Sequence, residues 1–338
     1  MFPNYVISGI YLWSINEAFP DSPVLAAAIF NVLLFAIAIY LVFEIWGLLL
    51  VDVATSRGVM LIAGLYMIFG LPAIPLWSYW MLSETIFLLV VCACIWATIR
   101  AVLFGGGRRW IYAAVFAIAG FFVRPTGILL LPLVIIAALL GGNRPHSIRS
   151  IRRRFLLMTT TATLFVFICV PLIVAVIFSD SSFNEVLPWY VKFKVSQAAH
   201  YYRLGWIIAD QPDTYVVGAN SVYEFISITI RRFIYYFLPL KSTFSMIHNV
   251  VNGVYLVIAL TGLYFGLRQL FSAGKRSSVV AYWLVLVALG YGLLHAMTIV
   301  SYGWRYQVPA MVPLWILAGI GLMNLGERIK SRKHRVRQ

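Results

Sequence analysis

The chain has 338 residues, of which 62% are hydrophobic and only 11% charged, and its net charge is +15. A soluble domain carries about 25% charged residues, so the composition excludes an ordinary soluble enzyme and predicts a polytopic membrane protein. The three cysteines lie in apolar runs and the five histidines are scattered. No metal or disulfide framework is visible, and no phosphate-loop, dinucleotide or zinc-protease motif occurs. We expect an all-α fold with about nine transmembrane helices.

The predicted elements divide the chain into five parts. Residues 1–22 are apolar and aromatic but interrupted by polar residues, which predicts an interfacial segment on the outer surface. Residues 23–178 hold six predicted spans, 179–244 form an outer loop with interfacial helices, 245–325 hold three more spans, and 326–338 form a basic cytoplasmic tail. The predicted spans lie near 24–46, 58–71, 81–103, 110–124, 126–140, 155–178, 245–267, 279–300 and 308–323.

The distribution of lysine and arginine sets the orientation. With the tail inside, 18 of the 26 basic residues and three of the 11 acidic residues fall on the cytoplasmic side. The outer side is then neutral. The positive charge therefore reflects membrane orientation and lipid contacts, and we expect no nucleic-acid partner.

This orientation places the amino terminus outside, although nothing in residues 1–22 would carry it across. Two alternatives remain: a preceding span is missing because the gene product is truncated, or the terminus is translocated without help. We favour the truncated chain.

The stretch 121–132, FFVRPTGILLLP, contains the first candidate functional residue. Pro125 predicts that one helix ends at Arg124 and another begins there. The apolar run before Arg124 spans about 14 residues, or roughly 21 Å, against a hydrocarbon core of roughly 30 Å. Arg124 is therefore expected at or just below the headgroup level. A charge there is a candidate functional group, the alternative being an arginine that snorkels to the interface.

Other polar residues are predicted on the same outer face. Glu84 opens the third span, and Arg305 and Tyr306 precede the last one. The outer loop adds basic and aromatic residues: Lys192, Arg203, Trp189 and Tyr190. A basic, aromatic-edged groove at this depth suits a phosphorylated lipid that carries a sugar, because arginine binds phosphate as a fork. The alternative is that Glu84 and Arg124 only pair with each other and lock two helices together.

The order of these motifs resembles the C-type superfamily of membrane glycosyltransferases, which includes dolichyl-phosphate-mannose protein mannosyltransferases and bacterial aminoarabinose transferases. The residues that carry the resemblance are Leu82-Ser83-Glu84, the RPTG within 121–132, and Arg305–Pro309 before a glycine-rich final span; Asn31 also fits. The resemblance covers most of the chain, from Tyr5 to Asn324.

The resemblance implies transfer of a sugar from a polyprenyl-phosphate carrier to a lipid, glycan or protein acceptor outside the cytoplasm, in a bacterial inner membrane. By this analogy Asp21 or Glu84 is the catalytic carboxylate, and a divalent metal is a candidate cofactor although no residue is assigned to hold one. Four basic residues would bind the donor phosphate: Arg124, Arg305, Lys192 and Arg203. Three aromatic residues would line the substrate groove: Tyr306, Trp189 and Tyr190.

The sequence departs from the family at its start. The family's first span and most of its first outer loop have no counterpart, so the expected carboxylate has no clear equivalent. We therefore expect this form to bind a polyprenyl-phosphate lipid without turning it over. Two other functions stay open: a transporter or flippase of lipid-linked sugars, and a non-catalytic partner in cell-envelope glycan assembly. No internal repeat is evident, which speaks against the transporter.

Overall fold

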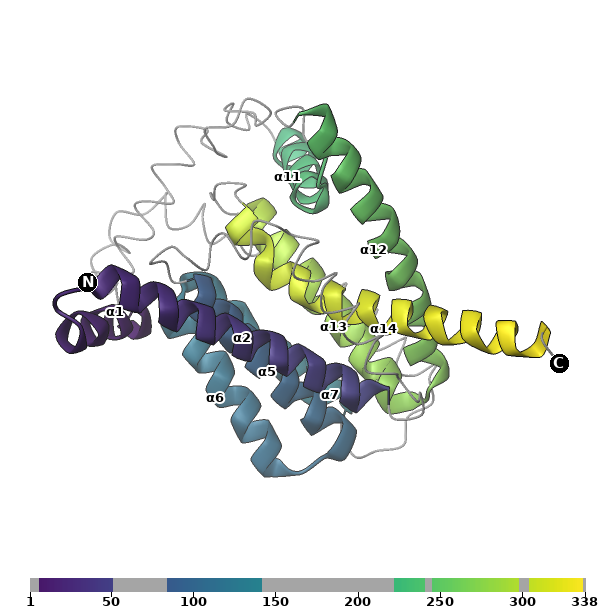
Figure 1. The fold of residues 1–338 in the computed structure, drawn as a ribbon, viewed down its shortest axis with the longest axis horizontal. Coiled ribbons are helices and arrows are strands. Elements are labelled where there is room, and N and C mark those ends of the chain that lie inside the picture. The colour runs from purple at the N-terminus through teal and green to yellow at the C-terminus, as the bar shows by residue number, and fades with distance from the viewer. Residues whose placement is uncertain (1–5, 51–83, 142–221, 241–244, 298–303, 337–338) are drawn as a thin grey trace.

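The computed structural model describes residues 6–50, 84–141, 222–240, 245–297 and 304–336, and every element in these ranges is helical (Figure 1). Five of the helices are long and apolar enough to cross a membrane, which indicates an integral membrane protein. They are α2 (Pro23–Leu49), α5 (Glu84–Phe104), α12 (Met246–Ser272), α13 (Lys275–Met297) and α14 (Trp304–Val336).

The all-α prediction is thus confirmed for the described residues, whereas the number of nine spans stays a prediction. The fourth and fifth predicted spans correspond to the shorter helices α6 (Gly107–Val123) and α7 (Leu130–Gly141), joined by a 3₁₀ turn, η2 (Pro125–Leu129). The spans predicted at 58–71 and 155–178, and most of the outer loop, lie outside the described residues.

The amino-terminal segment forms a helix, α1 (Val6–Ala18), that packs against α2 and α6. The hydroxyl of Tyr11 donates a hydrogen bond to Oδ1 of Asn31 in α2 at 2.9 Å, and partial burial raises the pKa of that hydroxyl. The hydroxyl of Ser8 donates to the carbonyl of Val123 at 3.3 Å. These bonds hold α1 at the end of the bundle where α6 finishes.

Helix α5 forms the centre of the described core and contacts α2, α6, α7, α13 and α14. Two buried tryptophans cross-link the surrounding helices through their indole N–H groups. Trp46 of α2 donates to the carbonyl of Ile316 at 3.0 Å, and Trp283 of α13 donates to the carbonyl of Leu133 at 2.8 Å. Each bond satisfies a polar group that would otherwise be unpaired in an apolar interior.

Helix α12 packs against α14 through glycines. A Cβ atom on Gly266 would overlap the carbonyl oxygen of Leu317, and one on Gly321 would overlap the carbonyl oxygen of Gly262. Small residues let two helix backbones approach closely in a membrane, where the hydrophobic effect does not drive helices together. The other end of α12 diverges from the bundle toward α11 (Val222–Phe237), as Figure 1 shows.

Charged residues lie at the two ends of the bundle. At one end, Arg109 donates to the carbonyl of Gly105 at 2.6 Å, and Arg276 of α13 donates to the carbonyl of Leu103. All of these belong to the predicted cytoplasmic side. At the opposite end Glu84 and Arg124, both predicted to face outside, lie in contact.

Candidate functional site

The chain breaks at Arg124 as the sequence predicts. Helix α6 ends at Val123, Arg124 is extended with φ −150° and ψ 145°, and η2 begins at Pro125. The N–H of Gly127 then donates to the carbonyl of Arg124 at 2.9 Å. Because proline disfavours a helical residue before it, the backbone of Arg124 leaves the helix and its side chain is set at the junction.

Arg124 and Glu84 form a buried ion pair. Nη1 of Arg124 lies 3.0 Å from Oε1 of Glu84, and the side chains are only 8% and 10% exposed. The guanidinium also lies 5.8 Å from the ring centroid of Phe87. Burial of two charges is favourable only when they are paired and hydrogen-bonded. The pairing of Glu84 with Arg124, which the sequence left as an alternative, is therefore present in the structure.

The pairing uses only one carboxylate oxygen. Oε2 of Glu84 is buried and has no hydrogen-bond partner within the part of the chain that the structure describes. A carboxylate oxygen in that position is an open acceptor for a hydroxyl or another donor. Glu84 thus keeps one oxygen that could meet a substrate.

A second buried arginine lies at the same end. Nη1 of Arg232 in α11 donates to the carbonyl of Ala296 at 2.9 Å, near the end of α13, and Arg232 is 7% exposed. Its neighbour Arg231 is exposed. One turn further along α11, Tyr236 packs against the ring of His295, with 4.7 Å between the ring centroids.

Both arginines belong to the outer loop 179–244, which the sequence predicts to carry interfacial helices, and that prediction does not include the burial of Arg232. The available signal was the spacing of Arg232 and Tyr236. Residues four apart share one face of a helix, so a buried aromatic at position 236 predicts a buried position at 232.

Tyr291 is a further buried polar residue at this end. It is fully buried in α13, one turn before His295, and it interacts electrostatically with Arg124 and Tyr236. Its hydroxyl has no hydrogen-bond partner among the described residues. We call the resulting set the buried polar cluster: Glu84, Arg124, Arg232, Tyr236, Tyr291 and His295.

The cluster has two arginines and one carboxylate, and its donors come from α11, α13 and the end of α6. Such a concentration of ionisable groups is costly in an apolar setting and marks a functional site by default. Its excess of guanidinium groups suits an anion, phosphate in particular.

Among the remaining predicted site residues, the structure describes the side chain of Asp21 alone, and Asp21 does not join this cluster. Asp21 is exposed in the turn between α1 and α2. Arg305 and Tyr306 lie in the first turn of α14, but their side chains fall outside the described residues, and so do the four outer-loop residues Lys192, Arg203, Trp189 and Tyr190. Their assigned roles stay predictions.

Within the described ranges, no three histidine, cysteine, aspartate or glutamate side chains come close enough to hold a metal ion. Comparison of the chain with protein-family models, curated proteins and solved structures gives no match. The glycosyltransferase resemblance therefore depends on the motifs of the sequence alone.

Proposed function

We propose that this protein is a membrane glycosyltransferase that takes a sugar from a polyprenyl-phosphate donor and passes it to an acceptor on the outer side of the membrane. One observation carries the proposal: the junction between α6 and η2 buries Arg124 beside Glu84 at the predicted outer end. A second buried arginine, Arg232, lies at the same end, on the helix whose Tyr236 packs against His295.

In this proposal the two arginines bind the donor phosphate. The acceptor oxygen attacks the anomeric carbon, the bond from that carbon to the phosphate oxygen breaks, and its electron pair leaves with the polyprenyl phosphate. Guanidinium groups aimed at the phosphate stabilise the negative charge that develops on it. The acceptor proton passes to a carboxylate acting as general base.

Two carboxylates are candidates for that base. Glu84 is held at the cluster and has an open oxygen, but its other oxygen is bound by the guanidinium of Arg124. Asp21 is exposed in the α1–α2 turn, where an acceptor from outside could reach it. Loss of transfer with retained donor binding in Asp21→Asn, but not in Glu84→Gln, would assign the role to Asp21.

The main test separates phosphate binding from a purely structural ion pair. Arg124→Gln alone leaves Glu84 buried and unpaired, so that variant confuses folding with binding. The double variant Glu84→Gln, Arg124→Gln keeps two amides of similar size that can hydrogen-bond each other. If Arg124 binds phosphate, the double variant folds but binds radiolabelled polyprenyl-phosphate sugar at least about tenfold more weakly, as a charged hydrogen bond is worth about 1.5–3 kcal/mol.

Glu84→Gln alone is the matched comparison. It keeps the guanidinium and a hydrogen-bond acceptor but removes the counter-charge of Arg124, so its folding is checked first by thermal unfolding. Donor binding should then persist. Arg231→Gln controls for general charge at this end, because Arg231 neighbours Arg232 but is exposed. If the double variant binds the donor as tightly as the unchanged protein does, the pair of Glu84 and Arg124 only holds two helices together. The proposal then loses its support.

A further inference from the structure

Helix α2 carries a carboxylate on the face that it turns away from the bundle. Glu44 is exposed, whereas its neighbours Val42, Ile45 and Trp46 are buried against the other helices. Other exposed residues recur on the same face at intervals of three or four: Leu33, Ile37, Tyr40 and Gly47. Glu44 therefore lies in the middle of a face that is otherwise apolar except for the hydroxyl of Tyr40.

The packing of α2 against α14 shows how deep Glu44 lies. Trp46 follows Glu44 by about half a turn and donates its indole N–H to the carbonyl of Ile316 at 3.0 Å. A Cβ atom on Gly319 would overlap the ring of the same tryptophan. Ile316 and Gly319 lie near the middle of the apolar stretch of α14, Gln307–Ile329. Glu44 is therefore level with the middle of a membrane-spanning helix.

The distance from the outer end of α2 also places Glu44 inside the membrane. Asn31 bonds Tyr11 of α1, the helix that packs where α6 finishes. Glu44 lies about 20 Å further along α2 at the helical rise. The apolar layer of a bilayer is roughly 30 Å thick, so Glu44 falls within it rather than at the cytoplasmic surface.

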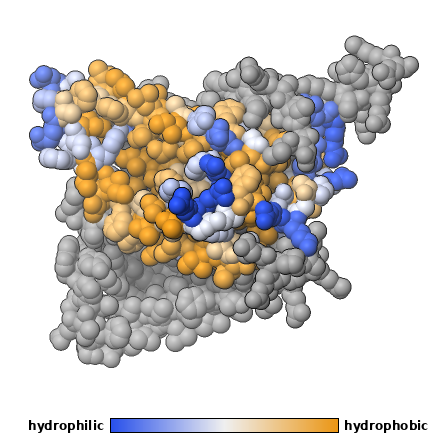
Figure 2. Space-filling view, turned by 90° about the horizontal axis from the view of Figure 1, so that it is seen from below, coloured by the Kyte–Doolittle hydropathy of each residue, from blue (hydrophilic) through white to orange (hydrophobic). Residues whose placement is uncertain are grey.

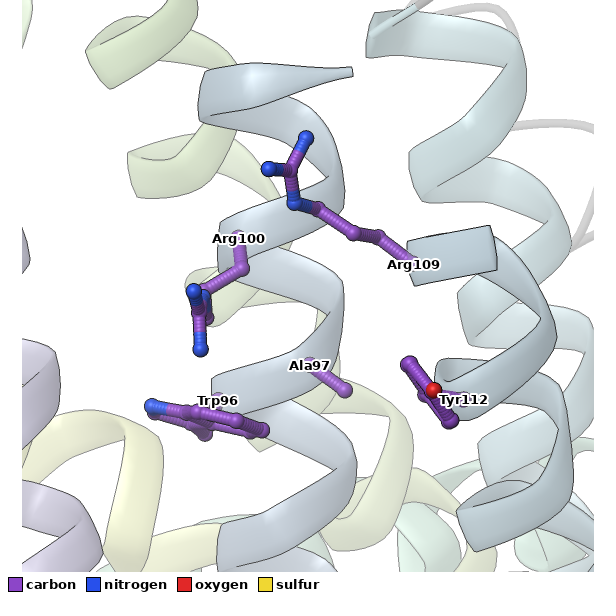
Figure 3. A pocket seen from close by; sticks show the side chains of 5 residues that line it. All are labelled: Trp96, Ala97, Arg100, Arg109 and Tyr112. Atoms are coloured by element: carbon purple, nitrogen blue, oxygen red, sulfur yellow. The ribbon is translucent and has the colours of Figure 1, made fainter. Parts of the chain in front are cut away.

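Only a hydroxyl meets this carboxylate within the described ranges. Tyr40, one turn earlier and 60% exposed, donates a hydrogen bond to Glu44. Glu44 forms no ion pair with any described residue. The arginines at the inner end of the bundle have other contacts: Arg100 lies over the ring of Trp96, and Arg109 reaches from α6 to backbone carbonyls at the end of α5 (Figure 3). A carboxylate accepts several hydrogen bonds, so Glu44 can still accept a cation.

Lipid alone is a poor neighbour for a carboxylate at this depth. The described surface drawn in Figure 2 is largely hydrophobic, with hydrophilic residues in small islands, as suits a bundle surrounded by acyl chains. Acyl chains offer no hydrogen-bond donor, and ionisable residues inside a membrane usually pair with another polar group. The side chain of glutamate is shorter than that of lysine or arginine, so it reaches the interface less easily. A second copy packed on the same face would oppose one Glu44 to the other, and like charges repel.

We propose that this face of α2 binds the transmembrane helix of a partner protein, and that an arginine or lysine of that helix pairs with Glu44. The partner is basic because the one charge on this face is negative. Gly47 lets a second helix come close, since a Cβ atom there meets nothing within 4 Å and small residues are favoured where membrane helices touch. Tyr40 orients the carboxylate from one turn away. The surface is separate from the buried polar cluster and independent of the proposed transferase function.

The test uses the whole protein in phosphatidylcholine vesicles, with a fluorophore on its carboxyl-terminal tail. The probe is a synthetic transmembrane helix of leucine and alanine that carries one arginine at its centre and a second fluorophore. Energy transfer should show that this peptide associates at least about tenfold more tightly than the same peptide with glutamine at its centre, because hydrogen bonds between charged groups are strong. A peptide whose arginine lies two turns from the centre should bind like the glutamine peptide, since its charge misses Glu44. Equal binding of the arginine and glutamine peptides would overturn the proposal.

Variants of the protein show whether Glu44 is the residue that binds the peptide. Glu44→Gln keeps the size of the side chain and should lose the preference for arginine. Glu17→Gln is the matched control and should keep it, since Glu17 is an exposed carboxylate on α1. Glu44→Arg should reverse the preference and select a peptide with a central glutamate; if that variant does not fold, Glu44→Gln decides alone. An undiminished preference for arginine in Glu44→Gln would contradict the site.

A further measurement separates a basic partner from a second copy. Stepwise photobleaching counts the protein molecules in each complex when no peptide is present. Monomers are expected, because two copies would bring like charges together. Dimers that disappear in Glu44→Gln would make the second copy the occupant and overturn the assignment to a basic partner.

Discussion

Gly127 packs its backbone against the carbonyl group of Gly120, so closely that a Cβ atom on Gly127 would overlap it. This contact lets the chain turn back within η2 and run into α7 beside α6. Arg124 lies between the two glycines at the point of reversal. In the RPTG motif the glycine therefore allows close backbone packing in the turn, and the proline ends helix α6.

The first prediction follows from that contact. Gly127→Ala should lower the stability of the protein by about 1–3 kcal/mol, because the added methyl group must displace backbone rather than a flexible side chain. Thermal unfolding in detergent measures the loss. Gly47→Ala is the control, since a Cβ there meets nothing within 4 Å and alanine in a helix is favoured by about 0.5–1 kcal/mol. Equal stability of the two variants would show that the turn can relax.

The second prediction concerns the α12–α14 contact. Gly266→Ala should destabilise the protein by about 1–3 kcal/mol, because its methyl group would overlap the carbonyl of Leu317. Gly253→Ala in the same helix should be neutral or stabilising, since the nearest atom there is a methyl group of Leu240 at 3.9 Å. Limited proteolysis of the two variants compares how firmly α12 is docked. Equal cleavage would mean that this glycine contact does not hold the helix.

The third prediction concerns the two adjacent arginines of α11. Arg232→Gln should cost about 1–3 kcal/mol, because Arg232 is buried and its bond to Ala296 ties α11 to α13. Arg231→Gln should cost less than about 1 kcal/mol, as interactions of exposed charges are weak. Chemical denaturation in mixed micelles can measure both. A larger effect of Arg231→Gln would show that α11 presents its other face to the bundle.

Some of this architecture could be predicted from the sequence because it depends on the chemistry of a few neighbouring residues. Pro125 forbids a continuous helix, so the break at Arg124 was predictable. Opposite charges at one predicted depth made the contact between Glu84 and Arg124 an explicit alternative. In both cases the chemistry of one or two residues restricts the chain strongly.

The packing of the apolar helices could not be predicted from the sequence in the same way. The apolar windows of α12 and α14 have the same mean hydropathy, 1.8, yet 11% of one and 78% of the other is buried inside the protein. Lipid and protein core are equally apolar, so a leucine facing either has the same sequence signature. The burial of Arg232 was missed for a related reason, because α11 looks interfacial until α13 covers one face.

The last prediction tests the orientation on which the proposed function depends. The α1–α2 turn at Asp21 is predicted to lie outside, and the α5–α6 turn at Arg108 inside; both residues are exposed. Single cysteines placed there, in a chain whose native cysteines are replaced by alanine, should react differently with a membrane-impermeant thiol reagent. On intact cells Asp21→Cys should be labelled, whereas Arg108→Cys should be labelled only after permeabilisation. The reverse pattern would put the buried polar cluster on the cytoplasmic side and exclude it from transfer at the outer surface. Labelling of both in intact cells would contradict placement of these two turns on opposite faces of the membrane.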